Sequence, residues 1–231
     1  MRDFVHFAAH RRSQLAVVMA GGFGTRLRPL TADAPKPLLC VAGRPVLFIL
    51  LDQVLNEGFE KVYLTLHYRA EDIIAMVRSV PRYRDRVEFV VEREPLGTAG
   101  SLACLPQRPS EPFLLMNADL LTEVPLRHML GHHEREGNAV TVATKLETYQ
   151  IPFGVFDMDG SRIVAVREKP SYSMVVNTGI YVVGPSALDA IEPGAALDMT
   201  DLLTRLMNDG QRIGSFPVHE YWLDIGTHEQ Y

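Results

Sequence analysis

Residues 15–24 read LAVVMAGGFG, and this stretch determines the fold class more firmly than any other in the sequence. Its apolar run, Leu15 to Met19, is continuous rather than alternating, which is typical of a strand buried on both faces of a parallel sheet. The run stops at Gly21-Gly22, where the backbone can approach a ligand closely because glycine has no Cβ and admits positive φ. A buried strand that ends in a glycine turn predicts an α/β sheet with a site at the carboxyl end of that strand.

Helix-like and strand-like segments alternate beyond this turn. Helical spacing is found over residues 45–58, 71–77, 98–104 and 126–136. Strand-like runs lie between and after them, at residues 61–66, 87–91, 113–116 and 139–144. Strands that alternate with helices imply right-handed crossovers, so we expect a largely parallel sheet with helices on both faces.

The pattern changes after about Gln150, where short strand-like segments are separated by Asp-Gly and Pro-Ser turn signals. These segments read FGVFDMDG, SRIVAVREKP and VVNTGIYVVG, and they predict a smaller antiparallel portion that covers one end of the main sheet. Helices near residues 185–190 and 199–209 and a final strand-like YWLDI follow. We therefore expect one domain over 1–231, with a leader at 1–14, a core over about 15–150 and a second portion over about 151–231.

Length and composition limit the class of protein. A chain of 231 residues with 47% hydrophobic residues can bury a sizeable core within one α/β domain. Its net charge of -5 argues against a nucleic-acid-binding surface, which normally carries a basic excess. No apolar run approaches the roughly 20 residues that span a bilayer, and the leader lacks the features of a signal peptide, so we expect a cytoplasmic protein without a membrane partner. The sequence also leaves room for a homo-oligomer.

The cysteines and the most conspicuous histidines are assigned no chemistry. Cys40 and Cys104 each lie in an apolar stretch without CxxC spacing, so we predict two small core residues and neither a disulfide nor a zinc site. The cluster His132-His133-Glu134 lacks HExxH spacing, and we interpret it as a solvated helix face. Trp222 is interpreted as a core residue.

The glycine turn itself predicts an anion site. Gly21, Gly22, Gly24 and Thr25 form a loop after a buried strand, and backbone N–H groups in such loops bind anions. Neither the P-loop pattern nor the full G-x-G-x-x-G pattern is present, so the glycines alone are equally compatible with a plain turn.

Two cations make a phosphate site the better interpretation. Arg26 follows the loop directly, and Lys36 stands between Pro35 and Pro37, which restrict the backbone so that the ammonium is aimed at little entropic cost. An arginine can hold two phosphate oxygens at once, while a lysine acts as a movable point charge. A nucleoside triphosphate under attack needs both kinds of support.

With these residues in place, the motif GGxGTRLxPLTxxxPKP over residues 21–37 resembles the signature of the sugar-phosphate nucleotidylyltransferases. The resemblance implies a Rossmann-like mixed sheet with a small antiparallel sugar-binding portion. It also implies an enzyme that transfers a nucleoside monophosphate from a nucleoside triphosphate to a sugar 1-phosphate, with Mg²⁺ as cofactor. Ala20 and the residues of the glycine loop would then bind the nucleotide.

Two aspartates follow strand-like runs. Asp119 comes after FLLM-Asn117-Ala118, at the carboxyl end of an expected buried strand, and Asp224 follows Tyr221-Trp222-Leu223. Each taken singly could be a turn or cap residue. The resemblance implies that both are magnesium ligands, because an [N/G]-G-D triplet and a W-x-D-x-G element supply them in that family. Ala118 departs from the usual glycine, and a positive φ at this position would strain it.

A third group lies in the second half of the chain. Glu168-Lys169-Pro170 ends a strand-like run, where a buried or half-buried lysine would suit an anion, whereas an exposed Glu-Lys pair would contribute little. The resemblance implies that Lys169 holds the sugar 1-phosphate and that Glu168 contacts sugar hydroxyls. It also places Gly154 and Asn177 at the sugar pocket.

The segment Glu94 to Gly100 reads EPLGTAG, ends a strand and opens a helix, so its amides could meet a base or phosphate. Thr98 could equally cap the helix. The PLGTAG form resembles the base-reading loop of GDP-sugar-forming members, which assigns Gly97 and Thr98 to the nucleotide and favours GTP.

The resulting hypothesis is in-line attack by the sugar phosphate on the α-phosphorus of GTP, with release of pyrophosphate. Arg26 would support the leaving pyrophosphate, Lys36 the α-phosphoryl region and Lys169 the incoming phosphate. Three alternatives stay open: a sugar enzyme that uses UTP, dTTP or CTP, a phosphocholine nucleotidylyltransferase, and a regulatory subunit that binds without turnover.

Overall fold

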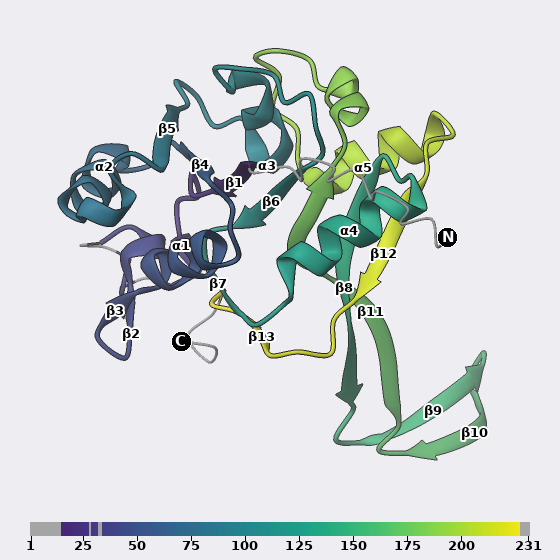
Figure 1. Ribbon diagram of the computed structural model, residues 1–231. Coiled ribbons are helices and arrows are strands. Elements are labelled where there is room, and N and C mark those ends of the chain that lie inside the picture. Colours follow the sequence, from purple (N-terminus) through teal and green to yellow (C-terminus); the bar gives the residue numbers. More distant parts are fainter. Residues whose placement is uncertain (1–14, 28, 32–33, 227–231) are drawn as a thin grey trace, which may run out of the picture.

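The computed structural model describes residues 15–27, 29–31 and 34–226, and its centre is a seven-stranded sheet (Figure 1). The strand β11 runs antiparallel to both of its neighbours, β6 and β8, while the other neighbouring pairs are parallel. In spatial order the strands are β12 (Ile213–Pro217), β8 (Val140–Gln150), β11 (Ser171–Val183), β6 (Phe113–Asn117), β1 (Leu15–Met19), β4 (Lys61–Leu66) and β5 (Val87–Val91).

The central strand β1 divides two hydrophobic cores. Ala16 and Val18 point into the first, while Val17 and Met19 point into the second, because successive side chains of a strand face opposite sides. The first core is covered by α1 (Val46–Asn56), α2 (Ala70–Ser79) and α4 (Leu126–Glu136), and the second by α5 (Met199–Asn208) with the short α3 (Gly97–Gly100). The predicted fold class, a mixed and mostly parallel sheet with helices on both faces, is confirmed.

Several short elements complete the described part of the chain, and the sequence predicted three of them, at residues 101–104, 185–190 and 222–224. Five 3₁₀ helices, η1 (Thr25–Leu27), η2 (Lys36–Leu38), η3 (Pro81–Tyr83), η4 (Ser101–Cys104) and η5 (Pro185–Ala190), connect the longer elements. Two small antiparallel pairs are β2 (Cys40–Val41) with β3 (Arg44–Pro45), and β7 (Leu120–Thr122) with β13 (Trp222–Asp224). The second pair brings the end of the described chain back to the glycine turn, where Ile225 is buried against Leu27 in a third small core.

The antiparallel portion differs from expectation. The strands β9 (Gly154–Asp159) and β10 (Arg162–Glu168) form a separate two-stranded sheet. They do not cover an end of the main sheet, since β8 and β11 continue beyond it and carry the hairpin away from the body (Figure 1). We call residues 146–175 the arm.

Other expectations are also corrected. Cys40 and Cys104 are exposed rather than in the core, because they stand at the start of β2 and the end of η4. His133 is buried on the sheet-facing side of α4 and contacts Thr141, so His132–Glu134 is not a wholly solvated face.

None of the helices in the described ranges is long and apolar enough to span a membrane. The predicted leader, 1–14, lies outside the described residues.

Candidate active site

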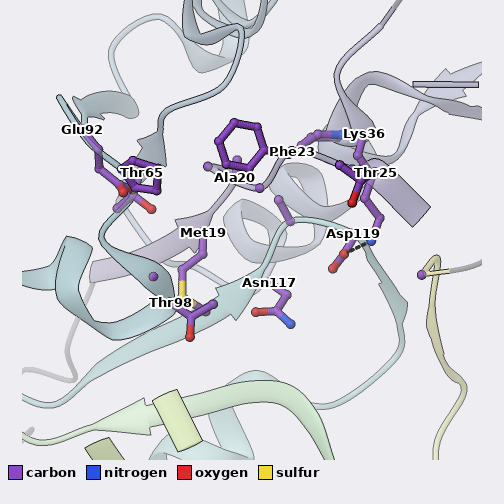
Figure 2. Close-up of a pocket in the computed structure, with 18 of the residues that line it drawn as sticks. Met19, Ala20, Phe23, Thr25, Lys36, Thr65, Glu92, Thr98, Asn117 and Asp119 are labelled. Atoms are coloured by element: carbon purple, nitrogen blue, oxygen red, sulfur yellow. Dashed lines mark hydrogen bonds and ion pairs between the residues drawn. The ribbon is translucent and has the colours of Figure 1, made fainter. Parts of the chain in front are cut away.

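A cavity of about 490 Å³ opens where β1 and β6 end (Figure 2). Its wall includes the predicted nucleotide-binding residues Ala20, Gly21, Gly22, Gly24, Thr25, Gly97 and Thr98. Lys36 and Asp119 also line it. The structure therefore brings the glycine turn, the proline-flanked lysine, one predicted metal ligand and the PLGTAG loop to a single site at the carboxyl edge of the sheet, as expected for this topology.

Two glycines of the turn have little room for a side chain, for different reasons. Gly24 has a φ of +62°, and a Cβ there would lie 3.1 Å from Lys36 Cβ and from Thr31 Cγ2. A Cβ on Gly21 would approach Glu92 Oε1 to 3.2 Å. The hydroxyl of Thr31 donates to the Gly24 carbonyl at 2.8 Å and fixes the turn. This contribution of Thr31 was not predicted.

Arg26 can be placed only in part. Its backbone belongs to η1, which directly continues the glycine turn, as the sequence suggested. Its side chain lies outside the part of the chain that the structure describes. The predicted contact with the leaving pyrophosphate therefore stays a prediction.

Lys36 begins η2 after Pro35, which has an extended backbone with ψ of 144°. Its ammonium forms an ion pair with Asp119 Oδ2, drawn as a dashed line in Figure 2, and lies 3.9 Å from Asp224 Oδ1. The side chain of Lys36 is only 13% exposed, so this charge is held between two carboxylates away from most solvent. A cation is thus accommodated at the point where both aspartates converge.

The two aspartates meet because β13 pairs with β7. Asp224 lies opposite Leu120, the residue after Asp119, and the Ile225 amide donates to the Asp119 carbonyl at 3.0 Å. Ala118 is buried and does not have a positive φ. The alanine that replaces the usual glycine therefore causes no backbone strain.

The donor set at this point suits a hard divalent cation. Asp119 Oδ1 is buried without a hydrogen-bond partner, which leaves a carboxylate oxygen available to a ligand. Among the described residues no group of three or more His, Cys, Asp or Glu side chains could hold a metal. Asp119 and Asp224 would therefore need oxygens from substrate or water to complete a shell, which is how Mg²⁺ is usually bound.

At the other end of the cavity, α5 holds the PLGTAG loop. Gly97 has a φ of +73°, and a Cβ there would lie 2.7 Å from the Leu197 carbonyl oxygen. The Thr98 amide donates to Asp198 Oδ1 at 3.1 Å, and the Thr98 hydroxyl accepts from the Met199 amide at 2.8 Å. The Thr98 hydroxyl thus accepts a hydrogen bond from the first residue of α5 and does not cap its own short helix. Asp198 also lines the cavity.

Glu92 is a site residue that sequence reasoning missed. It follows β5, is 7% exposed and lines the cavity beside the glycine turn (Figure 2). Its Oε2 accepts from the Leu96 amide at 3.0 Å. Burial raises the pKa of the Glu92 carboxyl above its ordinary value, and the Leu96 hydrogen bond partly opposes this. A charged residue directly after the apolar end of a strand, Phe89-Val90-Val91, was the available signal.

The predicted sugar residues are not brought to this cavity. Gly154 and Glu168 face each other across β9 and β10, and a Cβ on Gly154 would lie 3.2 Å from Glu168 Oε2. Lys169 follows with a φ of +45° and is exposed, contrary to the expected burial, because the arm has no second layer here. These three residues are together, but none of them lines the cavity.

Asn177 is engaged within β11. Its Nδ2 donates to the Tyr181 hydroxyl at 2.7 Å, and its Oδ1 accepts from the Gly179 amide at 2.9 Å. The two bonds span the irregularity in the β11–β8 pairing between Asn177 and Tyr181. Trp222 packs against the first core and donates its indole N–H to the Thr178 carbonyl at 2.9 Å, in agreement with the predicted core role.

A family model described as "Nucleotidyl transferase" matches residues 15–231. The chain belongs to the nucleotidyl transferase family. This nucleotidyl transferase is 34% identical to the mannose-1-phosphate guanyltransferase of Schizosaccharomyces pombe over 94% of its own length and 62% of that protein. It is 31% identical to mannose-1-phosphate guanylyltransferase 1 of Arabidopsis thaliana, again covering 94% of this chain and 62% of that protein. The chain thus spans about 60% of the length of the curated relatives it matches.

Solved structures agree with the assignment of this nucleotidyl transferase. The chain superimposes on HddC from Yersinia pseudotuberculosis, complexed with GMP-PN, with a TM-score of 0.73 and 25% identity, covering 94% of this chain and 96% of that one. The inositol-1-phosphate CTP transferase of T. maritima gives a TM-score of 0.72 at 17% identity, covering 95% and 92%, and shares the fold.

Proposed function

We propose that this nucleotidyl transferase transfers GMP from GTP to a sugar 1-phosphate and releases pyrophosphate. The observation that carries the proposal is the convergence of the glycine turn, Lys36, Asp119 and Asp224 at one edge of the sheet. Backbone amides, a mobile cation and paired carboxylates are the groups that a triphosphate under attack requires. We place the reaction in the cytoplasm, the compartment that the sequence favours.

The chain would act mainly by positioning and by charge. A phosphate oxygen of the sugar 1-phosphate attacks the α-phosphorus of GTP, the bond to the β-phosphate oxygen breaks, and pyrophosphate leaves. The nucleophile is already ionised at neutral pH, so no general base and no covalent intermediate are needed. Amides of Gly22 and Gly24 would face the phosphates, Arg26 the pyrophosphate and Lys169 the incoming phosphate.

Asp119 and Asp224 are assigned to Mg²⁺. When bound there, the ion would supply positive charge to phosphate oxygens at the reacting centre. Lys36 lies between the same two carboxylates. Because like charges repel, Lys36 would exchange its carboxylate partners for α-phosphoryl oxygens when these carboxylates hold the ion. The lysine thereby offsets part of the negative charge of the two partly exposed aspartates until substrate arrives.

Glu92 supports guanine as the base. Guanine presents two adjacent N–H donors, N1–H and the 2-amino group, and a carboxylate can accept from both. Adenine has an acceptor at N1, and uracil, thymine and cytosine lack this donor pair. A buried acceptor left without a donor costs more than an exposed one, so Glu92 would discriminate among bases. The relatives named as guanyltransferases agree with this choice.

The sugar assignment rests on the arm. Glu168 and Gly154 are paired and Lys169 is adjacent, which would place a carboxylate and an ammonium near one bound ligand. The relatives named for mannose 1-phosphate make that compound the first candidate, ahead of glucosamine and heptose 1-phosphates.

The test is a substrate grid followed by pyrophosphate release. GTP, ATP, UTP and CTP are each combined with the 1-phosphates of mannose, glucose, glucosamine and heptose in the presence of Mg²⁺. We expect release with GTP and one or two of the sugars, and no release from Asp119→Ala protein, which controls for contaminating enzymes. Release with UTP in preference to GTP would refute the base assignment. Silence with nucleotide binding intact would indicate a regulatory subunit.

A further inference from the structure

Asn117 ends an apolar row of β6 and turns a side-chain amide to the cavity. It is the last residue of the strand and lines the cavity beside Met19, its partner on β1. Phe113 and Leu115 precede it on the same side of β6, because alternate residues of a strand share a face, and both are fully buried in the second core. The amide of Asn117 therefore lies where this core gives way to the cavity (Figure 2).

The amide of Asn117 has hydrogen-bonding capacity that the protein does not use. Within residues 15–27, 29–31 and 34–226, its side chain forms no hydrogen bond. The group offers two N–H donors and a carbonyl acceptor, and leaving them unpaired in a partly buried position costs free energy. By contrast, Asn177 on the neighbouring strand β11 uses both ends of its amide within that strand. A ligand in the cavity can supply the partners that Asn117 lacks.

The backbone of β11 holds the Asn117 side chain from one side. Gly179 has a φ of +75°, and a Cβ there would lie 2.9 Å from Asn117 Cγ and closer still to its Nδ2. This glycine stands in the irregularity of the β11–β8 pairing, where its amide donates to Asn177 Oδ1 at 2.9 Å. Because a side chain at Gly179 would occupy the space of the Asn117 amide, the glycine permits the orientation that Asn117 has.

Asn117 lies between the two ends of the proposed nucleotide site. Glu92 marks the base end, and the order β6-β1-β4-β5 places it three strand spacings, or about 14 Å, from the backbone of Asn117. Asp119 marks the phosphate end and comes two residues after Asn117. Figure 2 shows Asn117 between Thr98 and Asp119. In a nucleoside triphosphate, the group between the base and the α-phosphate is the ribose.

We propose that Asn117 binds the ribose of the nucleotide through its 2′- and 3′-hydroxyls. A hydroxyl can both donate and accept, so the carbonyl oxygen of the amide accepts from one hydroxyl while its N–H donates to the other. Gly179 is a positioning residue, because it leaves the amide of Asn117 in place. This role for Asn117 rests on the proposed function, since it takes a ribonucleoside triphosphate as the ligand.

Ribose hydroxyls fit the Asn117 amide better than the other groups that enter the site. A phosphate offers acceptor oxygens only and would leave the carbonyl oxygen of the amide without a donor. The hydroxyls of the sugar 1-phosphate are the remaining candidates, but Gly154, Glu168 and Lys169, the residues predicted for the sugar, do not line this cavity. Contact with the sugar is therefore the outcome that the test has to separate from contact with the ribose.

The test compares GTP with 2′,3′-dideoxy-GTP, which keeps the base and the α-phosphorus and lacks both hydroxyls. With mannose 1-phosphate and Mg²⁺, pyrophosphate release from the unchanged protein should give a kcat/KM about 10- to 100-fold higher for GTP, as expected for two hydrogen bonds. Asn117→Ala should reduce this preference about tenfold by lowering the value for GTP, while the value for the analogue stays within about threefold. Gly179→Ala should reduce the preference in the same direction.

The matched control is Asn56→Ala, the same substitution at an exposed asparagine that accepts from Arg82. It should keep both the preference and the kcat/KM for GTP. A preference for GTP that Asn117→Ala leaves unchanged would overturn the ribose assignment. A loss confined to the KM for mannose 1-phosphate would also overturn it, because Asn117 would then contact the sugar.

Equilibrium binding separates the ribose assignment from the proposed transfer reaction. Competition between GTP and the dideoxy analogue needs neither a sugar phosphate nor turnover, and it can be measured on the unchanged protein even where a variant fails to fold. Tighter binding of GTP, by about tenfold or more, supports the assignment even if no sugar 1-phosphate is turned over and the transfer reaction is refuted. Equal affinities for the two nucleotides, or binding of neither, would overturn the assignment.

Discussion

The parallel half of the sheet and the arm are built on opposite principles. In the former, Ala16, Val17 and Val18 of β1 are fully buried between two cores, and the glycine turn, Lys36 and Asp119 are held where the strands end. In the arm, every residue of β10 is exposed, and Glu168 and Lys169 lie in a single layer of chain. One region fixes its polar groups before a ligand arrives, whereas the other presents them on an unsupported ribbon.

This contrast assigns different tasks to the two regions. Charge stabilisation at a reacting centre requires groups that do not reorganise during the reaction, and a core packed from both faces provides them. Segments with few buried apolar contacts have low local stability and adjust to a ligand or to a partner. We therefore expect changes in the body to lower turnover and changes in the arm to weaken binding of the sugar phosphate.

The largest effect is expected in the body, at Asp119. Asp119→Asn keeps the size of the side chain and removes the negative charge that Lys36 and the proposed Mg²⁺ share. Turnover should fall about 10²- to 10³-fold, as for other preorganised charges at a reaction centre. The measurement is kcat from pyrophosphate release at saturating GTP and sugar 1-phosphate.

The control for this change lies in the arm. Asp157→Asn removes a carboxylate from an exposed ion pair with Arg167, and exposed pairs contribute little. Its kcat should stay within about twofold of the unchanged protein. An equal loss of kcat in the Asp119→Asn and Asp157→Asn proteins would show that turnover does not depend on the body more than on the arm.

A smaller effect is expected at the base end of the cavity. Glu92→Gln replaces one carboxylate acceptor by a donor while keeping the side-chain shape, so the kcat/KM for GTP should fall about 10- to 100-fold. The kcat/KM for ATP should fall less or rise, because the amide can serve the N1 acceptor of adenine. The ratio of the two constants separates base recognition from general damage, and an unchanged ratio would remove Glu92 from the base site.

The arm should respond in binding rather than in turnover. Lys169 is exposed, so its charge acts through partly screened contacts, and Lys169→Met should raise the KM for the sugar 1-phosphate about tenfold. The KM for GTP should not change, because Lys169 does not line the nucleotide cavity. Initial rates at varied sugar phosphate and fixed GTP measure this. A rise in the KM for GTP of the same size would contradict the division between the regions.

The sequence predicted the buried parallel half best. The segments Lys61–Leu66, Val87–Val91 and Leu126–Glu136 have the predicted bounds, because burial leaves a continuous or helical apolar pattern that turn residues delimit. The strands of the arm were predicted, but their position over one end of the main sheet was wrong. The sequence pattern of a hairpin does not show whether another part of the protein packs against it.

The features of the site that the sequence did not predict depend on contacts between residues far apart in the chain. The pairing of β7 with β13 has three residues on each side, too few for a pattern, yet it sets the position of Asp224 beside Asp119. Glu92 was not singled out from the sequence, because it lies against the glycine turn that follows another strand. Cys40 and Cys104 were expected in the core from their apolar neighbours, although both stand at exposed ends of short elements.

The smallest effect concerns stability and should leave activity at neutral pH unchanged. His133 is 3% exposed beneath α4 and shares a hydrogen bond of 3.0 Å with the Thr141 hydroxyl. Burial, with a further contribution from the nearby charge of His132, lowers the pKa of His133 to about 4. In the unfolded chain the imidazole of His133 has its ordinary pKa of about 6.5. The contribution of His133 to the free energy of unfolding is therefore complete above about pH 6.5 and declines as the pH falls towards 4. Between about pH 7.5 and 5.5 the contribution to the free energy of unfolding should drop by about 1 kcal/mol. The measurement compares urea unfolding of the unchanged protein and His133→Asn at both pH values, since an amide does not titrate. An identical pH dependence in the two proteins would show that His133 does not carry the effect.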